Sequence, residues 1–181
     1  MILIILGLAL WAAVHFWKRA APDSRVSLGN TGKIIVAVGA VLAIVLMVIG
    51  YRGYDGPVYW GRTAAMTGIN NLLIVFAFYL YAASGAKTRI TRIIRHPQLT
   101  AVTIWAIAHL LVNGDLASFV LFGGLLAWAV AEVIVLNRAQ PNWTRPAAVP
   151  VKKEVTAVVA TVVVYGVVSG IHIWLGVNPF G

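Results

Sequence analysis

The sequence predicts an all-α, polytopic membrane protein: a bundle of about six transmembrane helices with both termini on the outer side. Of its 181 residues, 61% are hydrophobic and only 10% are charged, whereas a soluble domain carries about 25% charged residues. The apolar residues fall into runs near the length of about 20 residues that a helix needs to cross a bilayer. The basic residues cluster between alternate runs, which is the pattern that orients such helices.

The predicted spans, in order, are 1–17, 34–51, 69–85, 98–113, 117–136 and 155–176. The first is interpreted as a helix and not as a signal peptide, because its positive charges follow the apolar run. The fourth is short and is expected to begin one turn earlier, and Asn113-Gly114-Asp115 predicts a tight turn after it. The loops leave no room for a soluble domain, so residues 1–181 are predicted to form a single transmembrane domain.

Lysine and arginine predict the orientation of the bundle. Of the 14 such residues, all but Arg52 and Arg62 lie in the loops that follow the first, third and fifth spans. Basic loops stay on the cytoplasmic side of a membrane. The odd-numbered loops are therefore expected in the cytoplasm, and both termini are expected outside.

The sequence excludes several kinds of chemical site and one class of partner. The chain has no cysteine, which excludes disulfides, thiolate ligands, iron–sulfur clusters and a cysteine nucleophile. Motifs for phosphate binding, zinc proteases and serine nucleophiles are also absent from the sequence. The net charge of +9 lies in short loops beside apolar spans, where it contacts anionic lipid. Nucleic acid is therefore not an expected partner, and the lipid bilayer is.

Histidine is the residue type that points to a site. His15, His109 and His172 lie inside predicted spans, and His96 precedes Pro97 at the start of the fourth span. An ionisable side chain in hydrocarbon needs a partner. A single such histidine is most often an interhelical hydrogen bond. Three in a chain with so few polar residues favour a metal or haem site, because imidazole is a common ligand of both.

A haem site also requires cations for its propionates. The candidates on the cytoplasmic side are Lys18, Arg19, Arg89, Arg92 and Arg95. Glu132 lies near the cytoplasmic end of the fifth span, where an unpaired acid is costly. We expect it to pair with Arg95 or Arg138.

The run "RITRIIRHPQLTAVTIWAIAHLLVNGDLASFVLFGGLLAWAV" contains two of the four histidines. With "AVHF" near the N-terminus and "YDG" after the second span, it resembles the NnrU family of bacterial membrane proteins. That family is named for a requirement in nitrite and nitric oxide reduction. It is similar in turn to plant 15-cis-zeta-carotene isomerase, a haem b membrane enzyme.

The resemblance implies that His15 and His109 are the ligands of haem b. The isomerase has a cysteine three residues before its second ligand, where this sequence has Ala106, so ligand exchange to a thiolate is not implied here. The "RHP" motif also resembles membrane methyltransferases that use S-adenosylmethionine. Those enzymes carry adjacent glutamates downstream, whereas this chain has only Glu132. The role of His96 stays open between a propionate partner, a gate residue and an interfacial residue.

Depth along the spans favours a different pair of ligands. His15 lies about 7 Å to the cytoplasmic side of the centre of its span, and His109 lies about 7 Å to the outer side. His172 has nearly the depth of His109, and His15 shares the cytoplasmic side with His96, so two haems are also conceivable. His15 with His109 ranks first, because the resemblance covers both residues in context, and His109 with His172 ranks second.

The leading functional hypothesis is a haem b protein of the bacterial inner membrane. It either isomerises a lipophilic polyene or, with a redox partner protein, handles electrons in nitrite and nitric oxide metabolism. The alternatives are a membrane methyltransferase dependent on S-adenosylmethionine and a non-catalytic assembly factor for a respiratory reductase. The expected cofactor-binding residues are His15, His109, His172, His96, Arg95 and Arg92, with His15 and His109, or His172, on the metal.

Overall fold

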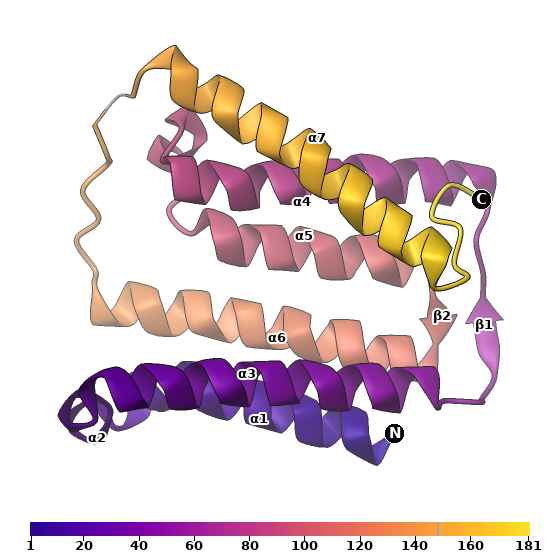
Figure 1. The fold of residues 1–181 in the computed structure, drawn as a ribbon, viewed down its shortest axis with the longest axis horizontal. Coiled ribbons are helices and arrows are strands. Elements are labelled where there is room, and N and C mark those ends of the chain that lie inside the picture. The colour runs from indigo at the N-terminus through magenta and orange to yellow at the C-terminus, as the bar shows by residue number, and fades with distance from the viewer. Residues whose placement is uncertain (148) are drawn as a thin grey trace.

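Six long helices form the molecule in the computed structural model, which describes residues 1–147 and 149–181. They are α1 (Ile2–Ala20), α3 (Gly29–Arg52), α4 (Ala64–Ala86), α5 (Pro97–Val112), α6 (Leu116–Ala139) and α7 (Val151–Trp174). Each packs on the next in the spatial order α3, α1, α6, α5, α4 and α7 (Figure 1). Two short helices, α2 (Pro22–Ser27) and the 3-10 helix η1 (Arg89–Arg92), follow α1 and α4.

Every predicted span coincides with one of these helices. Five of them, α1, α3, α4, α6 and α7, are long and apolar enough to cross a membrane, and α5 is a shorter apolar helix of 16 residues. This pattern is that of a membrane protein. The expectation that the fourth span begins one turn before residue 98 is wrong. Helix α5 begins at Pro97, because η1 occupies the preceding turn and proline suits the first position of a helix.

The prediction of an all-α fold missed a small antiparallel sheet. Strand β1 (Val58–Trp60) pairs with β2 (Gly114–Asp115), inside the segment predicted as a tight turn. The Trp60 ring packs so closely on Gly114 that a Cβ there would lie 2.3 Å from it. Asp115 accepts a hydrogen bond of 2.8 Å from the Ser118 backbone and caps α6. The sheet therefore joins the loop after α3 to the α5–α6 hairpin.

Helices α1 and α3 come into close backbone contact at two glycines. A Cβ on Gly7 would lie 2.8 Å from the Ala43 carbonyl oxygen, and one on Gly50 would lie 2.8 Å from the Ile4 nitrogen. Small residues allow such close backbone contact between membrane helices. Ile4 and Ala43 are fully buried there, in a cluster that includes residues from α6. The α1–α3 pair thus presents one packed face to α6.

The two ends of the bundle differ in charge. The loops that hold 12 of the 14 basic residues meet at the end where α2 and η1 lie, which we call the basic end. Met1 and Gly181 lie at the opposite end, beside the sheet, which we call the terminal end (Figure 1). The structure therefore brings both termini to one end, as predicted. The assignment of the basic end to the cytoplasm stays a prediction from loop charge.

Reporter fusions test this orientation. A reporter that is active only in the cytoplasm should be active after Arg92, in the loop at the basic end, and inactive after Arg62, at the terminal end. The matched control is a reporter active only in the periplasm, fused at the same two positions, which should give the reverse result. A cytoplasmic signal from the Arg62 fusion would overturn the orientation while leaving the helix packing untouched.

Candidate functional site

Two histidines lie near the terminal end of the bundle. His109 lies in the last turn of α5 and His172 in the last turn of α7. They are close enough that a positive charge on His172 would act on His109, and the charge of Arg62 acts on His109 as well. The His109 ring also packs against Trp105 and Phe122, with ring centroids 4.8 and 4.7 Å away. An imidazole pair with aromatic neighbours and one nearby cation therefore occupies this end.

The three histidines inside the long helices each make the same kind of hydrogen bond. Nδ1 of each ring bonds the backbone oxygen four residues earlier, in the pairs His15–Trp11 (2.8 Å), His109–Trp105 (2.9 Å) and His172–Val168 (2.8 Å). A carbonyl oxygen can only accept, so Nδ1 carries the proton of the neutral ring and Nε2 keeps its lone pair. Metal-binding histidines are held in the same way. Each of these side chains therefore offers Nε2 as a ligand atom.

His15 belongs to a second group, between α1 and α6. Its ring centroid lies 4.2 Å from that of Trp11 and 5.0 Å from that of Trp128, and the two indoles are 5.3 Å apart. Glu132 follows Trp128 by one turn, and the charges of Arg19 and His15 act on its carboxylate. Polar side chains, Arg19, Glu132 and His15, therefore lie along the α1–α6 interface from the basic end inward.

The contacts that the two groups make with helix α6 show how far apart the groups lie. His109 packs on Phe122, whereas His15 packs on Trp128. Six residues of helix separate these contacts by about 9 Å along the axis. Two nitrogens on opposite sides of one metal lie about 4 Å apart, twice a metal–nitrogen bond of about 2 Å. His15 and His109 thus occupy different levels of the bundle, as the depth estimate from the sequence predicts.

Three polar atoms of the second group are buried without a hydrogen-bond partner: Nε1 of Trp11, Nε1 of Trp128 and Oε2 of Glu132. Such groups are costly to leave unpaired. These two tryptophans were not singled out in the sequence analysis. The signal was the spacing of four residues from Trp11 to His15 and from Trp128 to Glu132, which places each pair on one face of its helix.

Glu132 has neighbours other than those predicted. The expectation of an ion pair with Arg95 or Arg138 is wrong, because Arg95 donates instead to the backbone oxygen of residue 140. Arg19 and His15 act on the carboxylate in their place. The reason is the spatial order of the helices, which sets α1 beside α6.

His96, Arg95 and Arg92 lie at the basic end, away from the histidine pair. His96 Nε2 lies 2.9 Å from Asn137 Oδ1, so this ring uses the nitrogen that the other three leave free. Thirteen residues separate His96 from His109, which is about 20 Å along a helix. His96 and Arg95 therefore join the start of α5 to the end of α6, and Arg92 is exposed on η1.

The C-terminal segment 175–181 lies over the terminal end. Arg62 donates to the backbone oxygen of residue 178, and Asn71 Nδ2 donates to that of residue 179 over 3.0 Å. Helix α4 begins at Ala64 after the Thr63 cap, so Asn71 lies inside it. These bonds hold the segment close to the histidine pair.

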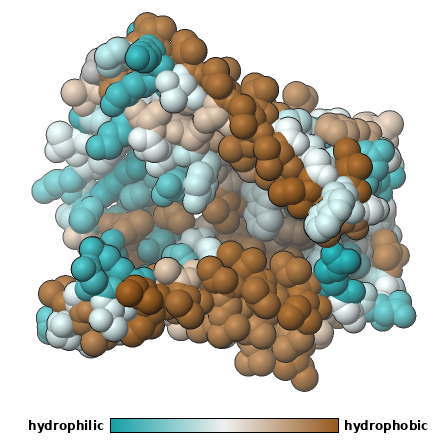
Figure 2. Space-filling model, in the orientation of Figure 1, coloured by the Kyte–Doolittle hydropathy of each residue, from teal (hydrophilic) through white to brown (hydrophobic). Residues whose placement is uncertain are grey.

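One face of the molecule is hollowed between α7 and the α1–α3 pair. Figure 2 shows teal, white and brown residues within the hollow, and mainly brown apolar residues along the helices that border it. Within residues 1–147 and 149–181, no three His, Cys, Asp or Glu side chains gather as they would around a bare metal ion.

Comparison with known proteins agrees with the sequence motifs. The family model described as NnrU protein matches residues 3–179. The chain belongs to the NnrU family. The match covers α1 to α7, and so both histidine groups of this NnrU protein lie within it. Comparisons with curated proteins and with solved structures give no match.

Proposed function

We propose that this NnrU-family protein is a haem b protein of the bacterial cytoplasmic membrane that handles electrons in nitrite and nitric oxide metabolism. The observation that carries the proposal is the state of His109 and His172. Both donate Nδ1–H to a backbone carbonyl, both keep Nε2 free, and the two rings lie within electrostatic reach of each other. Two such nitrogens could hold the iron of a haem, for which imidazole is a common ligand.

The surroundings of this pair fit a flat apolar cofactor. Trp105 and Phe122 pack edge to face with centroids 5.1 Å apart and flank His109. Arg62 supplies a positive charge at the same end, where a propionate carboxylate needs one. Arg92 and Arg95, at the basic end, are too distant for this role. This fit supports ligation by His109 and His172, the pair that the depth estimate favours and that ranks second in the sequence analysis.

Two fixed ligands favour electron handling over isomerisation of a polyene. A haem at this position would supply reversible one-electron chemistry. An isomerase needs an accessible or displaceable ligand. Here backbone hydrogen bonds orient both imidazoles, and Ala106 stands where the isomerase has a cysteine. The chain's own residues would bind the cofactor, orient it and keep water from it, and a separate redox partner would exchange the electron.

The absorption spectrum of the purified protein tests the proposal. After expression with haem supplied, we expect a Soret band, a pyridine haemochrome of the b type and a reversible spectral change on reduction. The low-spin spectrum of a bis-histidine haem is expected in both redox states. Colourless protein that is folded and monodisperse would rule the cofactor out, and a five-coordinate spectrum would rule out two fixed histidines.

A further inference from the structure

Residues 175–181 form a strap that turns back over the terminal end of the bundle. The turn begins at one of the two histidines of the site, because the backbone N–H of Val177 bonds the His172 carbonyl oxygen over 2.9 Å. Gly176 has a φ of 85°, the left-handed conformation in which glycine commonly ends a helix. Figure 1 shows the strap in yellow, with its end beside the start of α4. The strap is therefore attached directly to the last turn of the helix that carries His172.

Two side chains from outside α7 hold the strap. Arg62, between β1 and α4, donates to the backbone oxygen of Asn178, and Asn71 of α4 donates to that of Pro179 over 3.0 Å. Both acceptors are backbone atoms. Each bond can therefore be removed by changing its donor alone, with the sequence of the strap left intact.

The elements that hold the strap also contact the surroundings of His109. The charge of Arg62 acts on the His109 ring. Asn70, beside Asn71 on α4, is buried, and with its amide oriented so that both ends are paired it donates to the Ala108 backbone oxygen over 2.9 Å. The strap is thus connected to one histidine through its own chain and to the neighbourhood of the other through Arg62 and α4.

Few contacts keep the strap in place. Of its seven residues only Pro179 is not exposed, and the ring of Phe180 packs on Tyr165 of α7 with the centroids 6.3 Å apart. Segments with few buried contacts open locally while the rest of a fold stays intact. Irregular backbone is not exposed to lipid within the hydrocarbon, so the strap lies on the aqueous side of the histidine pair. Its opening would therefore uncover the pair toward water.

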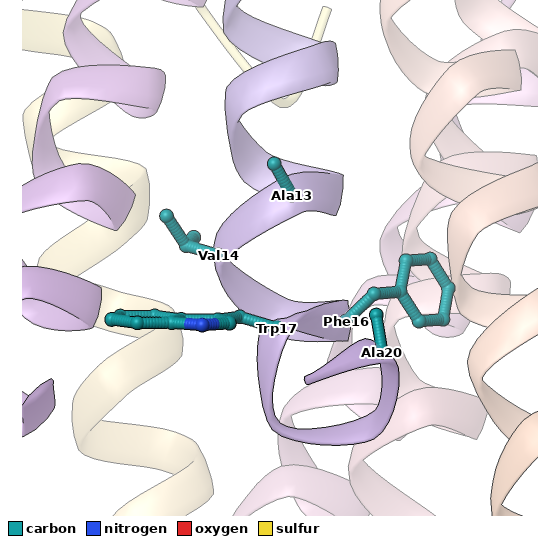
Figure 3. A pocket seen from close by; sticks show the side chains of 5 residues that line it. All are labelled: Ala13, Val14, Phe16, Trp17 and Ala20. Carbon is teal, nitrogen blue, oxygen red and sulfur yellow. The ribbon is translucent and has the colours of Figure 1, made fainter. Parts of the chain in front are cut away.

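Two grooves on the helices do not lead to the pair. One, of about 490 Å³, lies on α1 near the basic end, where Figure 3 shows Phe16 and Trp17 pointing to opposite sides of the helix. The other, of about 310 Å³, lies between α4 and α7. Neither is lined by His109 or His172. The strap, at the terminal end, is the element placed to control access to these rings.

We propose that the strap is a lid on the histidine pair. While Arg62 and Asn71 hold its backbone, it shields the free Nε2 atoms from solutes in the water at the terminal end. When they release it, the pair is open to a flat ligand that carries a carboxylate. A carboxylate is a stronger partner for a guanidinium than a backbone oxygen is, so an entering ligand would draw Arg62 away from the strap. The lid regulates the site described above and so rests on the proposed function.

Reaction of the haem-free, full-length protein in detergent with diethylpyrocarbonate tests the lid. The reagent modifies an unprotonated imidazole nitrogen, and peptide mass spectrometry gives the rate at each histidine. We expect His172 to react roughly 5- to 30-fold faster in Arg62→Gln/Asn71→Ala than in the wild-type protein, because two hydrogen bonds no longer hold the lid. Deleting residues 178–181 removes the acceptors and keeps both donors, and should have the same effect. The rate at His15, between α1 and α6, should not change.

The matched control is Arg52→Gln, which removes the other arginine of the terminal end, at the exposed end of α3. It should leave the rate at His172 unchanged. An equal rise in this control would assign the effect to charge at the terminal end and overturn the lid. A rise at His15 in the released variants would assign it to general loosening of the bundle, with the same consequence.

A spin label reports on the strap directly, because the chain has no cysteine of its own. Attached through Asn178→Cys, the label should be restrained in the otherwise wild-type protein and mobile once Arg62→Gln/Asn71→Ala is added. A label equally mobile in both, or a mobile label with an unchanged rate at His172, would overturn the lid. These measurements need no haem. Folded protein that stays colourless with haem would contradict the proposed function without changing them, whereas a bis-histidine haem spectrum with unchanged rates would contradict the lid alone.

Discussion

Replacing His109 by alanine should abolish haem binding, and replacing His172 should do the same. Each ring supplies one free Nε2, and both lie at the terminal end of the bundle. Without either one, the remaining imidazole would hold the iron on one face only. The measurement is the ratio of Soret absorbance to protein absorbance after purification with haem supplied. We expect that ratio to fall close to zero in both variants.

His15→Ala and His96→Ala are the matched controls, and both should keep the full ratio. His15 packs on Trp128, about 9 Å along α6 from the level of His109. His96 already uses Nε2 toward Asn137. Adding imidazole to His109→Gly should restore the Soret band, because the small ligand fits the space that the side chain leaves. If His15→Ala loses haem and His172→Ala keeps it, the ligand pair implied by the resemblance is correct and the one proposed here is wrong.

Replacing Gly7 by valine should destabilise the bundle strongly. The new Cβ would lie 2.8 Å from the Ala43 carbonyl oxygen and 3.0 Å from the Met47 nitrogen. These are backbone atoms, so α1 and α3 would have to move apart. Overpacking of this kind costs about 1–3 kcal/mol or more. For a chain of this size that corresponds to a melting temperature in detergent lower by about 2–12 °C.

The matched control is Gly68→Val on α4, where a Cβ meets nothing within 4 Å. It makes the same chemical change inside another long helix and should leave the melting temperature nearly unchanged. Gly50→Val should behave like Gly7→Val, because its Cβ would lie 2.8 Å from the Ile4 nitrogen. Equal destabilisation by Gly68→Val would assign the effect to helical glycine in general and not to the α1–α3 contact.

The helices could be predicted from the sequence because each is a continuous apolar run. Their spatial order could not, since it depends on contacts between residues far apart in the chain. The wrong partner for Glu132 shows the consequence. Arg95 and Arg138 lie near the same end of the bundle, but the charges that act on the carboxylate come from α1. Likewise, nothing near Gly7 in the sequence signals that Ala43 and Met47 lie against it.

The candidate site was predicted in part. All three histidines of the spans were identified from the sequence, and counting residues along each helix correctly separated the level of His15 from that of His109. The state of each ring was not foreseen, because a bond from Nδ1 to the carbonyl four residues earlier depends on the side-chain rotamer. Strand β1 also escaped prediction. Three residues that pair with a partner more than 50 positions away leave no local periodicity.

The spatial order of the helices has a consequence for biogenesis. Helix α1 leaves the ribosome well before its partner α6, which begins only at Leu116. At about 5–20 residues per second, roughly 5–20 s pass between the synthesis of the two. During that interval Trp11 and His15 face the membrane, or the insertion machinery, without the indole and carboxylate that later lie beside them. A chain truncated before α6 would therefore display these polar groups unpaired, and a quality-control protease that recognises polar groups in the bilayer could distinguish it from the finished protein.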